Sequence, residues 1–272
     1  AYLAAGRLDE AEREARKLLT TDAMGDAGLA LVARARAARG DATVEISRLQ
    51  AELERREDSA RLIETREVLA ALLHAQRRDE EAVRVIEGAA YRSVNLRLLL
   101  AEIAESRSDL AEAAEHYARA LSELTIDLTV GAKLADVYKR LGRFAESLEL
   151  YDRVIGIKPE EAFLYVDRGA VRFMMGEHAY AAADYRKAIS LDPRLPEAHL
   201  NLALAFLAEG NDVEAEKSLL RAVELRDDYA KAHRYLARLY RGRDDPRAER
   251  HAKRARSLET TSHHVDSSAA RS

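Results

Sequence analysis

The stretch GEHAYAAADYRKAISLDP, from Gly176 to Pro193, decides the fold because its key residues recur at one fixed distance along the chain. Gly142 and Gly210 lie 34 residues on either side of Gly176, and Pro159 lies 34 residues before Pro193. Tyrosines keep the same step, at Tyr117, Tyr151 and Tyr185. A period between about 20 and 50 residues is typical of structural units that stack on one another. The sequence therefore predicts a repeat array.

The composition favours helices and excludes several kinds of site. The 272 residues are 47% hydrophobic, and they are rich in Ala, Leu, Glu and Arg, which are good helix formers. The net charge of −4 gives no overall attraction to nucleic acid or to an anionic membrane. No apolar run reaches the roughly 18 residues of a membrane span. The absence of Cys excludes disulfides and thiolate zinc sites. Without a signal peptide the compartment stays unassigned, with the cytoplasm slightly favoured.

One repeat unit is predicted to be two helices joined by a turn at Gly210. The segment PEAHLNLALAFLAEG before this turn and the segment NDVEAEKSLLRAVELRDD after it both carry apolar residues at helical spacing. Small residues are expected where the two helices cross, here Ala203 and Ala215, and one repeat earlier Gly169 and Ala181. Proline ends the second helix of two units because it removes a backbone donor and clashes with a continuing turn.

The segment LADVYKRLGRFAESLELYDRVIGIKP, residues 134–159, resembles the tetratricopeptide repeat (TPR) family, whose unit has 34 residues. The units 160–193 and 194–227 match the family in the same way. The matching positions are Leu134, Ala135, Tyr138, Gly142, Phe144, Tyr151 and Pro159, then Tyr165, Gly169, Gly176, Ala181, Tyr185, Ala188 and Pro193, then Leu202, Ala203, Phe206, Gly210, Ala215 and Ala222. The resemblance implies an all-α, right-handed superhelical solenoid of antiparallel helix hairpins, with the first helix of each hairpin on the concave face.

The resemblance covers residues 1–258 as a TPR-like repeat array and is most specific over 95–228. Residues 1–94 are predicted to form degenerate repeats, and residues 229–258 a basic C-terminal capping hairpin. Residues 259–272 are polar and lack periodicity, which predicts a disordered tail. Because the chain opens within a helix-like segment, we expect it to be a fragment of a longer protein or a form trimmed upstream.

No group of residues in the sequence predicts catalysis, a cofactor or a metal ion. Each candidate turn carries a single Gly, unlike a phosphate-binding loop. His199 and His233 are 34 residues apart and would need two further ligands to hold zinc, so packing between adjacent helices is the favoured role. His263, His264 and Asp266 lie in the polar tail, where a chance grouping is the favoured interpretation.

The resemblance also implies which positions on the first helices line a partner-binding groove. They form an apolar stretch that is flanked by basic residues. The implied groove residues are Phe163, Val166, Ala170, Phe173, Leu200, Asn201, Leu204, Leu207, Lys231, Arg234 and Arg238. The alternative is that neighbouring helices bury the apolar side chains against one another, since apolar stripes at helical spacing are usually core.

Some members of the family bind the carboxylate tail of heat-shock chaperones through a set of Lys, Asn and Arg residues. Asn201 and Lys231 match that set, whereas Val166, Ala170 and Tyr235 depart from it. We therefore do not predict binding of a chaperone tail.

Residues 229–258 hold 10 Lys and Arg against 3 Asp and Glu. This excess indicates either a polar cap that solubilises the end of the array or a docking site for an acidic protein. Nucleic acid is the least favoured partner because stacking aromatics do not interleave the charges well.

The expected function is a non-catalytic protein–protein interaction scaffold. It would hold a partner peptide or helix in its concave groove, through apolar anchors and acidic residues on the partner. The alternative is a TPR region that regulates or docks a larger enzyme, from which this chain is a fragment.

Overall fold

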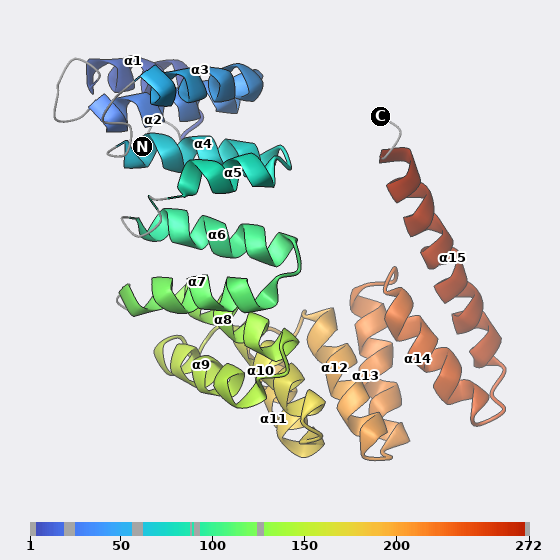
Figure 1. The fold of residues 1–272 in the computed structure, drawn as a ribbon. Helices are drawn as coiled ribbons and strands as arrows, with labels where there is room; N and C mark the ends of the chain where they lie inside the picture. Colours follow the sequence, from blue (N-terminus) through green and yellow to red (C-terminus); the bar gives the residue numbers. More distant parts are fainter. Residues whose placement is uncertain are drawn as a thin grey trace. The chain divides into compact units, whose positions relative to one another are not determined.

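The computed structural model describes residues 4–18, 25–55, 62–87, 89, 93–123 and 128–269. The chain divides into two compact units, Ala1–Val130 and Gly131–Ser272. Within the described ranges the regular structure is helical and contains no strand, which confirms the predicted all-α class. In chain order the helices are α1 (Leu8–Leu18), α2 (Gly25–Arg36), the π-helical η1 (Ala37–Asp41), α3 (Ala42–Arg55), α4 (Ile63–Ala75), α5 (Asp79–Ile86), α6 (Val94–Ser106), α7 (Leu110–Glu123), α8 (Leu128–Arg140), α9 (Phe144–Ile157), α10 (Ala162–Met174), α11 (His178–Leu191), α12 (Pro196–Ala208), α13 (Asp212–Leu225), α14 (Ala230–Arg241) and α15 (Arg247–Ala269) (Figure 1).

In the first unit, helices that follow one another in the chain pack as pairs. Helix α4 packs against α5, α6 packs against α7, and α1 packs against α2 ahead of them (Figure 1). Helix α2 continues into α3 through η1, where Gly40 takes a φ of +104° that L side chains rarely adopt. The N-terminal segment that the sequence predicted as degenerate repeats therefore keeps paired helices.

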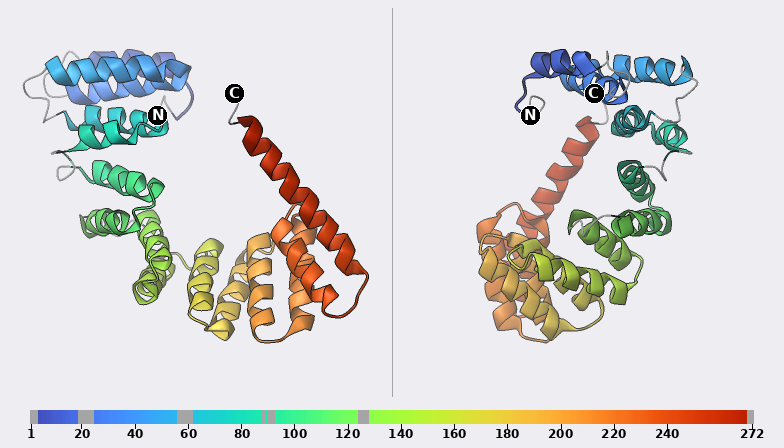
Figure 2. Two further views of the ribbon diagram at one scale, coloured as in Figure 1. Left: turned by 45° about the vertical axis from the view of Figure 1, so that its right-hand side comes forward. Right: turned by 90° about the vertical axis from the view of Figure 1, so that its left-hand side faces the viewer.

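The second unit continues the same arrangement. Helices α10 and α11, α12 and α13, and α14 and α15 form hairpins, and contacts of α11 with α12 and of α13 with α14 stack each hairpin on the next (Figure 2). Helices α8 and α9 are joined by the Ser147 hydroxyl, which donates to the backbone carbonyl of Ala135 at 2.6 Å. This stack of helix hairpins confirms the fold predicted from the repeat period.

The turn inside each hairpin repeats one backbone conformation. The φ angle is +74° at Gly142, +81° at Gly176 and +75° at Gly210. Ser108 and Asp244 take the equivalent places in the neighbouring hairpins, with φ angles of +64° and +52°, although neither is Gly. In each turn the residue after the positive-φ position donates its amide across the helix end, at 2.8–3.0 Å. This is the Schellman motif, which satisfies the last carbonyls of a helix.

A second contact repeats at the loop between hairpins. Tyr165, His199 and His233 stand 34 residues apart, and the side chain of each lies 3.0–3.1 Å from the backbone carbonyl oxygen six residues earlier. Each side chain thus ties the first helix of a hairpin to the loop that precedes it. This contact is to the preceding loop, whereas the sequence predicted packing between adjacent first helices for His199 and His233.

Aromatic and small side chains share the core. Tyr117, Tyr151 and Tyr185 are each at most 2% exposed, and Leu219 fills the next place in the series. Burial raises the pKa of Tyr151 and of Tyr185, so both phenols stay neutral. Ala203, which the sequence placed at a helix crossing, is fully buried. Residues that recur every 34 positions therefore occupy equivalent places in the hydrophobic core.

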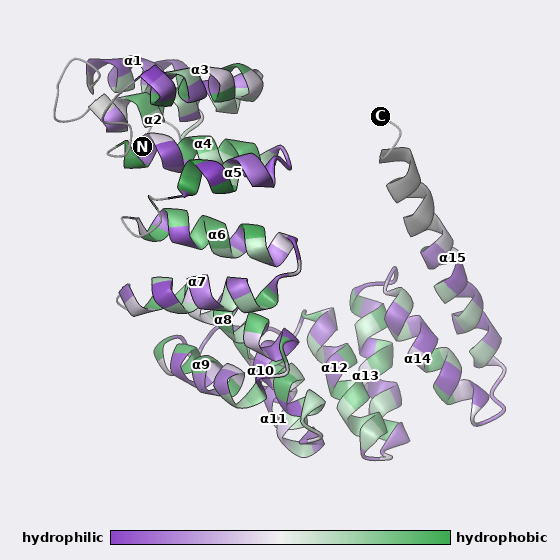
Figure 3. Ribbon diagram, viewed as in Figure 1, coloured by the Kyte–Doolittle hydropathy of each residue, from purple (hydrophilic) through white to green (hydrophobic). Residues whose placement is uncertain are grey.

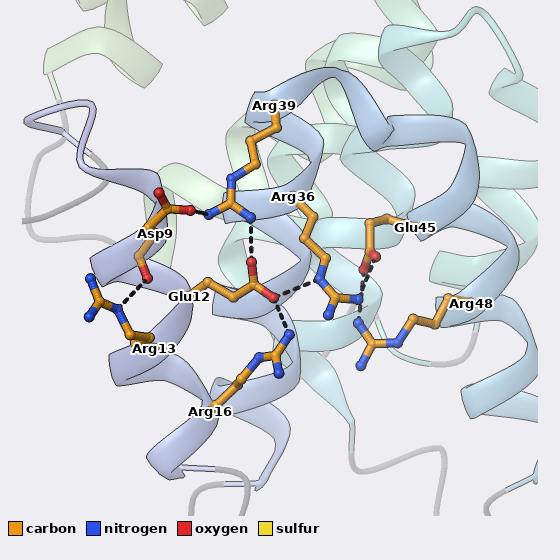
Figure 4. Close-up of polar contacts among 8 residues, drawn as sticks. All are labelled: Asp9, Glu12, Arg13, Arg16, Arg36, Arg39, Glu45 and Arg48. Carbon is orange, nitrogen blue, oxygen red and sulfur yellow. Dashed lines mark hydrogen bonds and ion pairs between the residues drawn. The ribbon is translucent and has the colours of Figure 1, made fainter.

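An ion-pair network holds the first three helices together (Figure 4). The buried Glu12 carboxylate accepts hydrogen bonds from Arg16 at 2.6 Å, Arg36 at 2.9 Å and Arg39 at 2.5 Å. Arg36 also donates to Glu45, a carboxylate that is only 1% exposed, at 3.1 Å. The hydrogen bond from Arg16, opposed by burial and aided by the other two arginines, lowers the pKa of Glu12 to about 2. These ion pairs add contacts between helices that a short stripe of apolar residues on each helix would not provide.

Helix α15 is longer than the sequence indicates. Its backbone is helical from Arg247 to Ala269, whereas the sequence predicted a disordered tail over 259–272, and residues 270–272 lie outside the described residues. The segment 259–269 contains no Gly or Pro, and extending a helix that already exists costs far less than nucleating one. The described part of α15 is mostly hydrophilic (Figure 3).

Candidate functional site

A pocket of about 510 Å³ lies on helices α10, α12 and α14 of the second unit. Its lining residues are Phe173, Leu204, Leu207, Ala208, Asp212, Tyr235, Arg238, Leu239 and Gly242. The pocket combines an apolar wall with one cationic and one anionic side chain. Pockets of this size and mixture are typical of binding sites.

Helical spacing brings the lining residues to one side. Tyr235 and Arg238 are three residues apart, so they lie on the same face of α14, and Gly242 follows at the C-terminal cap of that helix. Leu204 and Leu207 have the same relationship on α12, and both are half-buried while packing against the core of this unit. Their remaining exposed surface is available to a ligand. The apolar wall of the pocket therefore adjoins the hydrophobic core and is partly exposed.

The two charged side chains at the pocket differ in whether a side chain of opposite charge lies near them. Asp212 has a cation nearby, because the guanidinium of Arg243 lies 3.9 Å from its carboxylate. Arg238 is exposed and has no hydrogen-bond or ion-pair partner in the part of the chain that the structure describes. An incoming carboxylate would therefore meet an available guanidinium without displacing an internal partner.

Four of the predicted groove residues lie together in this pocket: Phe173, Leu204, Leu207 and Arg238. Other predicted residues lie outside its lining. Of these, Phe163 and Lys231 are exposed, Val166, Ala170 and Asn201 are half-buried, and Arg234 pairs with Glu259 at 3.4 Å. The pocket thus joins three of the predicted apolar groove residues to one of the three predicted basic residues, Arg238.

Leu200 was predicted to line the groove, but the structure places it in the hydrophobic core. Its side chain is 1% exposed and belongs to the hydrophobic core with Tyr185 and Leu236. Leu200 lies one turn before Leu204 on the same face of α12, and there the side chains of the neighbouring helices close over it. For this residue the alternative of burial between first helices is correct.

The groove pattern missed several lining residues. Tyr235 appeared in the sequence only as a departure from the chaperone-binding set, yet it lies three residues before Arg238 on the same helix face. Asp212 begins α13 just after the Gly210 turn and reaches the pocket from the second helix of a hairpin. The spacing within α14 could have found Tyr235, whereas nothing in a pattern of first helices points to Asp212.

The described residues offer neither a metal site nor a membrane-spanning helix. The described residues contain no group of three or more side chains placed to ligate a metal ion. The side chains of His263, His264 and Asp266 lie outside the described residues. In the same part of the chain, every helix is too short or too polar to cross a bilayer.

Comparisons with known proteins agree with the fold. A TPR repeat profile matches residues 172–210, and a tetratricopeptide repeat profile matches residues 132–161. The TPR repeat-containing thioredoxin TTL4 of Arabidopsis thaliana is 44% identical over 72 residues, covering 26% of this chain and 11% of that protein. The heat shock protein sti1 homolog of Schizosaccharomyces pombe is 30% identical over 129 residues, covering 47% of this chain and 20% of that protein. The chain thus spans a fifth or less of the length of these relatives.

Solved structures share the same architecture. The C-terminal part of a TPR repeat-containing protein from Cytophaga hutchinsonii aligns with a TM-score of 0.65, at 16% identity, over 82% of this chain and 92% of that one. A crystal structure of MamA aligns with a TM-score of 0.54, at 19% identity, over 61% of this chain and 97% of that one. The stacked hairpins and the pocket between their first helices define a helical repeat protein. The chain carries tetratricopeptide repeats at residues 132–161 and 172–210.

Proposed function

We propose that this chain is a protein-interaction scaffold whose pocket on α10, α12 and α14 binds a short segment of a partner protein. The observation that carries the proposal is one juxtaposition: partly exposed Leu204 and Leu207 beside Arg238, which has no acidic partner in the described residues. An apolar side chain of the segment enters the pocket, and an acidic residue that follows it pairs with Arg238. Lys231, on the first turn of α14, is exposed and adds to the positive potential.

The relatives support the class of function. They include the sti1 homolog and the Hsp70-Hsp90 organizing protein 3 of Arabidopsis thaliana, which is 29% identical over 86 residues. The departures at Val166, Ala170 and Tyr235 argue against a chaperone tail as the ligand here. We therefore propose an apolar–acidic segment that an apolar pocket recognises first, without a set of side chains dedicated to a terminal carboxylate.

A second candidate function is a docking or regulatory region within a larger enzyme. The match to a TPR repeat-containing thioredoxin covers only 11% of that protein, so repeats of this kind occur inside longer chains with further domains. In this candidate the pocket holds a segment of the enzyme domain itself. The full-length reading frame discriminates between the two candidates.

The experiment is selection of a random peptide library on the full chain, followed by affinity measurements with the selected peptide. We expect a consensus of an apolar residue followed by Asp or Glu. Leu204→Glu should weaken binding by roughly thirtyfold, because a desolvated anchor contact contributes about 2 kcal/mol. Val213→Glu is the matched control, since Val213 is 60% exposed and lies outside the pocket.

Arg238→Gln should relax the preference for acidic residues while leaving the apolar preference. A library that yields no consensus, or Leu204→Glu and Val213→Glu variants that bind equally well, would contradict the pocket as the binding site. If Leu204→Glu unfolds the chain, Leu204 belongs to the core and the groove interpretation is wrong at this position.

A further inference from the structure

A second and larger pocket, of about 640 Å³, lies between helices α13, α14 and α15. We call it the terminal groove. Leu220 and Val223 of α13 form an apolar wall, while Arg250, Lys253 and Arg254 of α15 are among the residues of a basic wall. Helix α14 contacts both α13 and α15 and lies between them. The terminal groove is therefore built by the last hairpin together with the second helix of the hairpin before it.

The terminal groove is separate from the pocket of the proposed function. His233 and Tyr240 of α14 line the terminal groove and are seven residues apart, which is about two helical turns. Tyr235 and Arg238 of the same helix line the other pocket. At about 100° per residue, Tyr235 points roughly opposite to His233. The two pockets thus lie on different faces of α14, and a ligand in one leaves the other free.

The basic wall contains cations that no acidic side chain neutralises. Arg250 and Lys253 are exposed, and within the described part of the chain neither has an ion-pair or hydrogen-bond partner. Arg254 pairs only with Asp227, an exposed residue whose carboxylate also lines the groove. Arg247 is already engaged by Asp245 at 2.7 Å and by Glu216 at 3.3 Å. The free positive charge therefore lies in the first two turns of α15.

A pair of histidines forms the floor beside this wall. The Nδ1 atoms of His233 and His251 lie 2.8 Å apart, and Nε2 of His233 lies 3.0 Å from the backbone carbonyl oxygen of Asp227. A neutral His233 that donates through Nε2 accepts at Nδ1, so His251 is the donor between the rings. No third metal-ligating side chain joins them among the described residues. The pair fixes α15 on α14 and leaves the exposed Arg and Lys side chains to bind a ligand.

The shape and charge select the ligand. The lining of α15 runs from Arg247 to Ser257, about 15 Å at the helical rise per residue. An extended peptide covers that length with about four or five residues. The opposite wall is aliphatic. Tyr240 and His233 are buried, and the half-buried His251 ring already contacts the rings of both, so the groove offers a base no free ring for stacking. We propose that the terminal groove binds an extended acidic segment of a partner protein, with an apolar side chain against Leu220 and Val223.

Asp227 acts in the free protein as an internal competitor for this ligand. Its carboxylate pairs with Arg254 at the groove, yet the aspartate side chain is 75% exposed, so the pair is weak and can be displaced. Removing the Asp227 charge should therefore strengthen binding of an acidic segment. A gain of binding cannot be produced by a misfolded variant.

The test measures fluorescence anisotropy of the full chain with a labelled peptide, Gly-Glu-Glu-Leu-Glu-Glu-Gly, and with the counterpart that has Gln in place of each Glu. We expect binding of the Glu peptide that weakens with salt, and no binding of the Gln peptide. Arg250→Gln combined with Lys253→Gln should weaken binding about tenfold, and Asp227→Asn should tighten it about threefold. Arg256→Gln is the matched control, because Arg256 is exposed on α15, pairs with Glu249 and lies outside the groove.

Three outcomes would overturn the proposal. One is equal loss of binding in the Arg256→Gln control and the double variant, which would show unspecific attraction to a basic helix. Another is competition by a single-stranded oligothymidylate at concentrations no higher than those of the Glu peptide, which would assign the groove to nucleic acid. The third is unchanged or weaker binding by Asp227→Asn. The Leu204→Glu variant should keep full affinity for the Glu peptide, so failure here is distinguishable from failure of the first pocket.

Discussion

The Cε1 atom of Tyr185 lies only 2.7 Å from the place that a Cβ atom would take on Gly169. The two residues belong to α11 and α10, so the ring of one helix rests directly on the backbone of the other. The sequence predicted Gly169 at this crossing opposite Ala181, and the ring of Tyr185 is the nearer neighbour. Gly169 is thus a packing requirement of the hairpin.

Gly169→Ala should destabilise the second unit by about 1–3 kcal/mol, although Ala is the better helix former. The buried Tyr185 ring must shift to admit the methyl group. Gly156→Ala is the matched control, because Gly156 lies within α9 and nothing stands within 4 Å of its added Cβ. That variant should be stabilised by up to about 1 kcal/mol. Urea unfolding measures both, and equal effects of the two substitutions would contradict the close contact.

The hairpin turns that have another residue in place of Gly at positive φ, and those that have Gly, predict a second pair of opposite effects. Ser108 holds a φ of +64°, which costs an L residue about 1–2 kcal/mol relative to glycine. Ser108→Gly should therefore raise the stability of the first unit by about 1 kcal/mol. Gly176→Ser should lower the stability of the second unit by a similar amount, since no atom lies within 4 Å of the added Cβ and only the backbone is strained. A Ser108→Gly variant with an unchanged or lower melting temperature would show that the turn is held by other contacts.

The sequence predicted the features that the repeat itself sets. It missed the features that depend on contacts between neighbouring helices. Gly142, Gly176 and Gly210 could be assigned to turns because a positive φ favours glycine through the backbone alone. Leu200 and Leu204 lie one turn apart on α12 and look alike in sequence, yet one is core and the other lines the pocket. Their difference arises from how closely the adjacent first helices approach at each level of the stack. No property of a single helix carries that information.

The N-terminal part depends on contacts between charged side chains. Residues 1–94 match the repeat pattern poorly, and there Glu12, Arg36 and Glu45 supply contacts between helices that a short apolar stripe does not. The spacing of apolar residues does not predict such contacts. Their presence could be suspected from the many charges of α1, whereas the partners of each charge follow only from the structure.

Glu12 predicts a pH dependence of the first unit. Its pKa of about 2 in the folded state is below its usual value of 4.5, so its contribution to stability is present above pH 4.5 and is lost as the pH falls toward 2. Glu12→Gln should cost about 2 kcal/mol at neutral pH, because three arginines lose a charged acceptor. Between pH 4.5 and 2 the free energy of unfolding of this variant should fall less than that of the wild type. Glu14→Gln, which changes an exposed carboxylate on the same helix, is the control and should keep the decline. Urea unfolding at a series of pH values measures both variants.

His251 predicts loosening of α15 on mild acidification. Burial, then the neighbouring His233, Arg250 and Arg247, lower its pKa from the usual 6.5, so the folded state favours the neutral ring. Stability from this group is therefore present above pH 6.5 and is lost as the pH falls below that value. Protonation of His251 leaves it a donor to His233, but it places a third positive charge beside those of Arg247 and Arg250 in a half-buried site.

The experiment for His251 is amide hydrogen exchange of α15, with the amides of α11 as an internal reference. The protection of the α15 amides, corrected for the intrinsic slowing of exchange at lower pH, should fall between about pH 7.5 and 5.5 relative to that of the α11 amides. His251→Asn keeps a side-chain donor near the Nδ1 position and removes the titration, so α15 in that variant should stay protected at the lower pH. His199→Asn is the control, because His199 is distant in the stack and bonds a backbone carbonyl. If His251→Asn loses protection over the same pH range as the wild type, the charge on His251 does not control the docking of α15.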